Sequence, residues 1–137
     1  MIETARWTLY GYCTPAGGRS VQEWFDGLLE EERDEAKDTL VYLQGVPLTQ
    51  WAKPEYYPLG DGLSEVRFKV NELNRIYRIY SCFWPKGVRF SYTFLLGNDK
   101  KLSNPKHDIA EARKRKNRLE QGKASVNEFI FQKIVDC

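Results

Sequence analysis

Three consecutive stretches of alternating apolar and polar residues restrict the possible folds most strongly. They cover about residues 63–70, 75–84 and 88–96, and only short turn sequences separate them. Alternation with a period of two is typical of strands that bury one face, and short connections favour antiparallel neighbours. In the third stretch the apolar positions are Val88, Phe90, Tyr92, Phe94 and Leu96. The sequence therefore predicts an antiparallel meander with an apolar face that another layer must cover.

Helices are the predicted covering layer. Ser20 and Glu23 form a capping-box pattern, and an apolar stripe follows at Val21, Trp24, Phe25, Leu28 and Leu29. A second helix is expected from the acidic run at residues 30–32 to Gly45, so that the two form a hairpin. A basic helix is expected after Asn104 and Pro105, ending near residue 121.

These patterns predict one α+β domain over residues 1–122. A first strand is expected at residues 6–12, and the proline-rich residues 46–62 are expected to be a loop. The predicted twisted antiparallel sheet has helices on one face and a basic open face on the other. Residues 123–137 are expected to be an extension that packs on the domain or binds a partner.

Charge is distributed unevenly along the chain, although the net charge is only +2. Residues 1–65 hold 5 Lys and Arg against 12 Asp and Glu, a net −7. Residues 66–118 hold 14 against 4, a net +10. A basic segment of this size favours a polyanionic partner such as nucleic acid, although a solvated, lopsided surface is the alternative.

Cations lie inside the predicted strands as well as on the predicted helix. Arg67 and Lys69 share one face of the first strand of the meander, Arg78 is central in the second, and Lys100 and Lys101 follow the third. On neighbouring antiparallel strands these side chains converge on one side of the sheet, where they can bind a phosphodiester and stabilise its transition state. The alternative is a soluble sheet face whose cations pair with Glu65 and Glu72.

The order of these motifs resembles the RelE/HigB superfamily of toxins from bacterial toxin–antitoxin pairs, in particular its HigB-like, phage-derived branch. The resemblance covers about residues 5–121. It is carried by the helical hairpin and by four short motifs at matching spacing: Glu65-Val66-Arg67, Tyr77-Arg78-Ile79, Lys100-Lys101, and Pro105 with Ile109 and Ala112.

The resemblance implies a small, metal-independent endoribonuclease that cuts mRNA on the ribosome. A cytoplasmic location is expected because the apolar runs in the sequence are too short to span a membrane. A cognate antitoxin, expected to be a helix-turn-helix protein, would restrain the endoribonuclease; no cofactor, metal or membrane is implied. Carried over by position, the catalytic set is Arg67, Arg78, Lys100 and Lys101. Further RNA-binding residues are expected at Lys69, Arg75, Tyr80, Lys106, His107 and Arg113.

Some residues depart from the family pattern or permit a simpler interpretation. Leu102 and Asn104 replace a threonine and a second lysine, which lowers the positive charge of the loop. His107 can be a proton shuttle or a plain helix-surface residue, and Tyr80 can stack on a base or belong to the core. The alternative function is therefore a non-catalytic binding protein, either a ParE-like gyrase inhibitor or an inactive phage homologue that pairs with an antitoxin.

Overall fold

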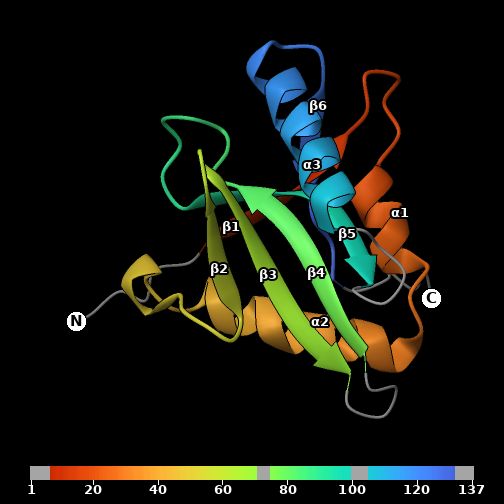
Figure 1. Cartoon of the computed structure of the whole chain (residues 1–137), viewed down its shortest axis with the longest axis vertical. Helices are drawn as coiled ribbons and strands as arrows, with labels where there is room; N and C mark the ends of the chain where they lie inside the picture. Colours follow the sequence, from red (N-terminus) through yellow and green to blue (C-terminus); the bar gives the residue numbers. More distant parts are fainter. Residues whose placement is uncertain (1–6, 71–74, 100–104, 132–137) are drawn as a thin grey trace, which may run out of the picture.

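A six-stranded sheet forms the centre of the protein (Figure 1), which a computed structural model describes over residues 7–70, 75–99 and 105–131. The strand order is β2-β3-β4-β5-β1-β6. The strands are β1 Thr8–Cys13, β2 Tyr56–Gly60, β3 Leu63–Val70, β4 Arg75–Cys82, β5 Ser91–Asp99 and β6 Ser125–Glu128. The expected α+β class is confirmed, whereas the expected purely antiparallel sheet is wrong because β1 pairs with β5 in parallel. A parallel neighbour requires a crossover, and the two N-terminal helices are part of it.

The predicted helical hairpin is confirmed as α1 Ser20–Asp26 and α2 Glu30–Gln44. Both helices pack on the same sheet face, and α2 passes behind β3 and β4 in Figure 1. The ring of Trp24 lies directly against Gly97 of β5, where any Cβ would overlap it. Glycine is therefore needed at this position so that α1 can approach the sheet closely.

The predicted capping box at Ser20 is wrong. Arg19 precedes α1 and no side chain caps the helix. Ser20 lies inside the first turn, where its hydroxyl accepts a hydrogen bond from Arg115 at 3.1 Å. A glutamate does act at the start of α2, because the Glu32 carboxylate accepts hydrogen bonds from the Leu29 N–H at 2.6 Å and from the Tyr77 hydroxyl.

Residues 46–62 contain a strand that their prolines concealed. β2 pairs with β3 in an antiparallel ladder, and a short 3-10 helix, Leu48–Gln50, precedes it. Pro58 lies within β2, which forms one edge of the sheet. An edge strand tolerates proline because its outward N–H groups have no ladder partner. The prediction that the whole segment is a loop is therefore wrong.

The third strand of the meander begins three residues later than predicted, at Ser91. Val88 and Phe90 are 52% and 41% exposed and do not belong to the buried strand face. Phe90 has a φ of +57°, which a strand does not allow. Its carbonyl accepts the Thr8 N–H at 2.7 Å, and its ring packs edge-on against Trp7. The residue just before β5, Phe90, therefore fixes where β1 enters the sheet.

The second sheet face is not open, contrary to the expectation. Helix α3, Pro105–Glu120, lies across β4 and β5 on the side opposite the hairpin (Figure 1). Arg115 anchors it by donating hydrogen bonds to the Leu95 carbonyl and the Ser20 hydroxyl. Ala112 and Leu119 of α3 are buried. Helices therefore cover parts of both faces, and on the second face Arg67 and Lys69 of β3 are among the described residues that reach solvent.

The segment after α3 returns to the sheet. Gly122 has a φ of +72°, which ends the helix, and β6 then pairs antiparallel with β1. Phe129 is buried and contacts the rings of Phe25 and Phe94 edge-on. In the described part of the chain, no helix has the length and apolar character needed to cross a membrane.

Candidate nucleic-acid interface

Arg67 and Arg78, here called the arginine pair, lie directly opposite each other on β3 and β4. Side chains alternate between the two faces along each strand. The neighbouring cross-strand pair, Val66 and Ile79, therefore faces the hairpin, and the arginine pair faces the other way. The arginine pair therefore shares the sheet face that carries α3. Of the cations that were predicted to converge, Arg67 and Arg78 thus lie side by side, whereas Lys100 and Lys101 lie outside the described residues.

A buried carboxylate lies between the two guanidinium groups. Glu65 is 1% exposed and accepts a hydrogen bond from Arg67 Nε. Its Oε1 atom is also 3.9 Å from Arg78 Nε. One negative charge thus offsets part of two positive charges. The alternative pairing of the sheet cations with Glu65 is therefore present, whereas Glu72 lies outside the described residues. The arginine pair keeps an excess of positive charge.

The exposure of the two arginines differs. The Arg67 side chain is 26% exposed, whereas Arg78 as a residue is only 9% exposed. Arg78 Nε makes no hydrogen bond within the described residues. Arg67 is therefore the member of the pair that reaches solvent. Arg78 adds positive charge from a buried position, and its Nε–H is a donor that a ligand could use.

A buried polar layer continues from the arginine pair towards α3. Asn98, opposite Arg78 on β5, donates a hydrogen bond to Asp108 of α3 at 2.8 Å. The hydroxyl of Tyr80 and one oxygen of Asp108 are buried and make no hydrogen bond in the described ranges. Burial raises the pKa of Tyr80, and the neighbouring Arg78 opposes this rise, so the phenol is neutral at physiological pH.

The remaining predicted RNA-binding residues are distributed over this side and its rim. Lys69 is exposed on the same face of β3, and Arg75 is half-buried at the start of β4. Lys106 and His107 are exposed in the first turn of α3. Tyr80 is 0% exposed, so it belongs to the core and is not placed to stack on a base. Lys100 and Lys101 lie outside the described residues, between Asp99 of β5 and Pro105 of α3.

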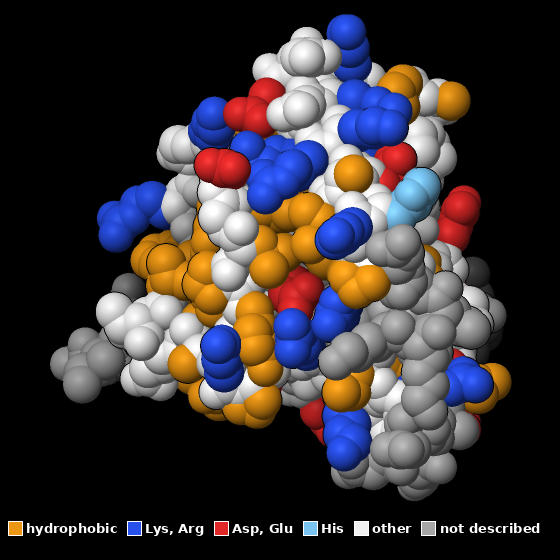
Figure 2. Space-filling model, in the orientation of Figure 1, with side chains coloured by type: hydrophobic (Ala, Val, Ile, Leu, Met, Phe, Trp, Pro, Cys, Tyr) orange, Lys and Arg blue, Asp and Glu red, His pale blue; other side chains and the backbone are white. Residues whose placement is uncertain are grey.

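Part of the basic run of α3 makes contacts within the protein, so not all of its cations face solvent freely. Arg115 contacts Glu111, Ser20 and Leu95, and its guanidinium lies 5.2 Å from the Tyr12 ring centroid. Lys116 pairs with Glu120 at 3.0 Å, and Arg113 is 3.7 Å from Asp61. Figure 2 nevertheless shows Lys and Arg side chains gathered over α3, and others beside an acidic patch on the strands.

An accessible groove, here called the edge groove, adjoins the arginine pair and was not predicted. Its volume is about 340 Å³. It contains Arg67, Lys69, Glu35 and Glu55, with Pro54, Phe68 and Ile76 as apolar walls. Tyr57 of β2 also lines it, and the Arg67 guanidinium lies 3.7 Å above its ring centroid. The nearest signal in the sequence is the pair Tyr56-Tyr57, within the segment that the prolines predicted to be a loop.

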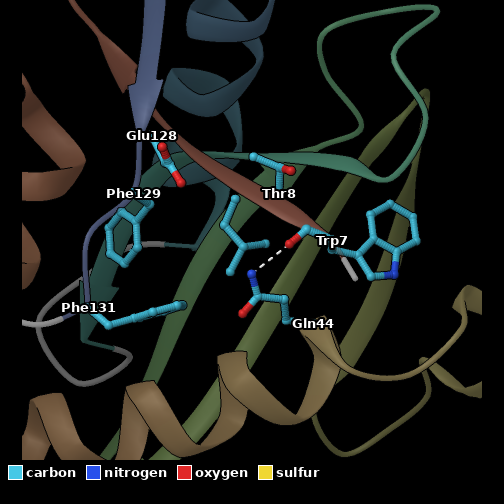
Figure 3. A pocket seen from close by; sticks show the side chains of 7 residues that line it. Trp7, Thr8, Gln44, Glu128, Phe129 and Phe131 are labelled. Atoms are coloured by element: carbon cyan, nitrogen blue, oxygen red, sulfur yellow. Dashed lines mark hydrogen bonds between the residues drawn. The ribbon is translucent and has the colours of Figure 1, made fainter. Parts of the chain in front are cut away.

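A second cavity of about 360 Å³ lies between β1, the end of β6 and α2. Figure 3 shows the rings of Phe129 and Phe131 on one side and Trp7 on the other. The Gln44 amide donates a hydrogen bond to the Trp7 carbonyl at 2.6 Å, which ties α2 to the start of β1. Glu128 is the one charged side chain among the described residues that line it. These lining residues include no lysine or arginine, and so they do not supply the cations that phosphate binding requires.

The arrangement around the arginine pair suits an anionic, aromatic-bearing ligand. It supplies guanidinium groups, an adjacent aromatic ring and nearby carboxylates that can accept protons or hydrogen bonds. Among the described residues, no group of three histidine, cysteine or acidic side chains is arranged to hold a metal ion. Compared with models of protein families, with curated proteins and with solved structures, the chain matches none of them.

Proposed function

We propose that this protein is a RelE/HigB-like toxin that binds RNA at the arginine pair and cleaves mRNA on the ribosome. The observation that carries the proposal is the cross-strand register of Arg67 and Arg78. They are the arginines of the two central family-like motifs, and they share one face beside an accessible groove. The helical hairpin, the meander and the basic final helix also agree with the architecture that the resemblance implies.

The proposed chemistry requires no metal. A phosphodiester beside Arg67 would exchange part of the Glu65–Arg67 contact for a contact between the guanidinium and phosphate oxygens. The 2′-hydroxyl attacks the phosphorus as a base removes its proton, and the 5′-oxygen leaves as it takes up a proton. Arg67 and Arg78 stabilise the extra negative charge of the pentacovalent transition state. Glu35 and Glu55 are the carboxylates that line the groove beside Arg67.

Restraint by an antitoxin belongs to the same proposal. A toxin of this kind must be held inactive by a partner that covers its cationic face or fills its groove. Charge favours a partner segment with carboxylates, because these would occupy the arginine pair as a phosphate does. The proposal therefore includes a small antitoxin protein encoded beside this chain.

One observation favours a second function, a toxin-like binding protein without catalysis. Glu65 already occupies Arg67 and reduces the charge available to a transition state. A gyrase inhibitor or an inactive homologue paired with an antitoxin would use the same surface for binding alone. The two functions differ in one outcome, the cutting of RNA.

Removal of Arg78 tests the proposal. We expect Arg78→Ala to abolish growth inhibition on induced expression, because the substitution removes half of the arginine pair. Arg19→Ala is the matched control. Arg19 is exposed at the start of α1, which belongs to the hairpin on the sheet face opposite the arginine pair. Circular dichroism of both purified variants checks that the fold is retained.

Mapping of mRNA 5′ ends separates the two functions. Cuts in translated messages that disappear in Arg78→Ala support the ribosome-dependent endoribonuclease. Growth inhibition without new 5′ ends supports the binding protein. An Arg78→Ala variant that folds and stays fully toxic contradicts both, because each places its ligand on the arginine pair.

A further inference from the structure

We infer that the edge groove binds one nucleobase of the RNA, stacked at Tyr57 and Arg67, and that it prefers bases with amino groups. This inference rests on the proposed function, because the arginine pair must hold the phosphate of the same strand. It adds a recognition site to that surface and names the chemical group that the site reads.

Arg67 connects the phosphate site to the base site. Its Nε donates to Glu65, while the guanidinium carbon lies 3.7 Å from the centroid of the Tyr57 ring. Tyr57 is opposite Glu65 in the β2–β3 ladder, so ring and guanidinium lie on the same face of the sheet. Unpaired bases are held by stacking on aromatic rings and on guanidinium planes. A nucleotide carries its phosphate and base on one sugar, as this juxtaposition requires.

The lining of the groove suits a base better than a second phosphate. Pro54, Phe68 and Ile76 supply apolar walls, and the volume of about 340 Å³ lies in the range of small-molecule sites. Beyond Arg67, the charged lining residues are Glu35, Glu55 and Lys69, so two carboxylates against one ammonium group disfavour another phosphate. The same carboxylates accept hydrogen bonds from the amino groups of cytosine, adenine and guanine. Uracil has no amino group and is therefore disfavoured.

The outer edge of β3 supplies further hydrogen-bonding groups. The Arg67 N–H donates to the Glu55 carbonyl at 2.9 Å, and β2 provides no ladder partner beyond this point. Two residues further, the peptide groups of Lys69 face the same edge, because alternate residues of a strand direct their N–H and C=O to the same side. Within the described ranges no strand lies beside them. A donor and an acceptor are thus available to the edge of a bound base.

The test compares RNA with and without bases. Binding of 2′-O-methyl pentamers, which cannot be cleaved through the 2′-oxygen, is measured by fluorescence anisotropy at fixed salt. The pentamers are oligo-A, oligo-C, oligo-U and an abasic sugar–phosphate chain. The variants are Tyr57→Ala, which removes the ring, and Tyr57→Phe, which keeps it.

We expect wild-type protein to bind oligo-C and oligo-A about 5- to 150-fold more tightly than the abasic chain, the range of one stacked base. Oligo-U should fall between them. Tyr57→Ala should bind every pentamer as weakly as wild type binds the abasic chain, and Tyr57→Phe should behave as wild type. Glu55→Gln should reduce the preference over oligo-U.

Three results would overturn the inference. The first is a Tyr57→Ala variant that weakens abasic and base-bearing chains alike, because Tyr57 would then only support Arg67. The second is wild-type protein that binds all pentamers equally, and the third is wild-type protein that binds none. Arg78→Ala distinguishes the failure of the proposed function: if it binds the abasic chain as wild type does, the arginine pair is not a phosphate site.

Discussion

The two faces of β3 differ in burial and in charge, although the residues of both faces alternate along one strand. Val66, Phe68 and Val70 are buried beneath the hairpin, where ring and aliphatic contacts exclude water. Glu65, Arg67 and Lys69 lie on the face that α3 only partly covers. One face contributes to stability mainly through apolar burial, and the other keeps charge available for a ligand. Because successive side chains point to opposite faces, a single strand can contribute to the core with one set of residues and to ligand binding with the other.

Each face also buries one glutamate, and the partners of these two carboxylates differ. Glu32 of α2 accepts hydrogen bonds from neutral donors, the Tyr77 hydroxyl and the Leu29 N–H. Glu65 accepts from the Arg67 guanidinium and lies near that of Arg78. Glu32 therefore fastens α2 to the sheet, while Glu65 sets how much positive charge remains on the opposite face.

The largest effect is expected from an apolar truncation on the hairpin face. Phe94→Ala removes a ring that is 0% exposed and contacts Tyr92 and Phe129, and should lower the free energy of unfolding by about 3–5 kcal/mol. Lys69→Ala, on the exposed part of the other face, should change it by less than about 0.5 kcal/mol. Urea denaturation measures both. Similar losses in the two variants would abolish the distinction between the faces.

An intermediate effect is expected from the two buried glutamates. Glu32→Gln and Glu65→Gln should each lower the free energy of unfolding by about 1–3 kcal/mol, because a charged acceptor of buried hydrogen bonds becomes a neutral amide with only one acceptor oxygen. Only Glu65→Gln should also strengthen binding of the abasic chain, by about 1 kcal/mol or roughly fivefold, since a competing carboxylate disappears. Tighter binding in Glu32→Gln, or none in Glu65→Gln, would show that Glu65 does not set the charge of the face.

The smallest effect concerns an exposed contact between α3 and the turn before β5. Hydrogen bonds from Lys86 and then Lys116 lower the pKa of Glu120 below its usual range. A depressed pKa in the folded state stabilises the protein above the ordinary glutamate pKa, and this contribution is lost as the pH falls through the folded-state value. Wild type should therefore lose slightly more Tm between pH 6 and pH 3 than Glu120→Gln. The difference should shrink in high salt, and a difference of opposite sign would contradict it.

The elements with a clear period could be predicted from the sequence. Helices α1 and α2 and strands β3 and β4 follow from their apolar spacing, and the shared face of Arg67 and Arg78 follows from the alternation. The pairing with Glu65 was also accessible, because it is two residues from Arg67 on the same face.

Features that depend on distant parts of the chain could not be predicted. The parallel position of β1 depends on the end of the turn at Phe90, and the covering of the second face depends on contacts that Arg115 makes with Ser20 and Leu95. Prolines concealed β2, and with it the contact between Tyr57 and Arg67. Local periodicity contains no information about which strand forms an edge, and this choice positions the edge groove.

The place of β1 in the sheet has a consequence for how the protein is made. β1 is translated before the other strands, yet Thr8 pairs with Ser91 of β5 and Tyr10 pairs with Glu128 of β6. The consecutive strands β2, β3 and β4 can pair during synthesis, whereas both edges of β1 stay unpaired until β5 and β6 have been translated. Pairings so distant in sequence slow folding and leave an aggregation-prone edge exposed. A nascent chain of this protein therefore completes its sheet only after translation of β6.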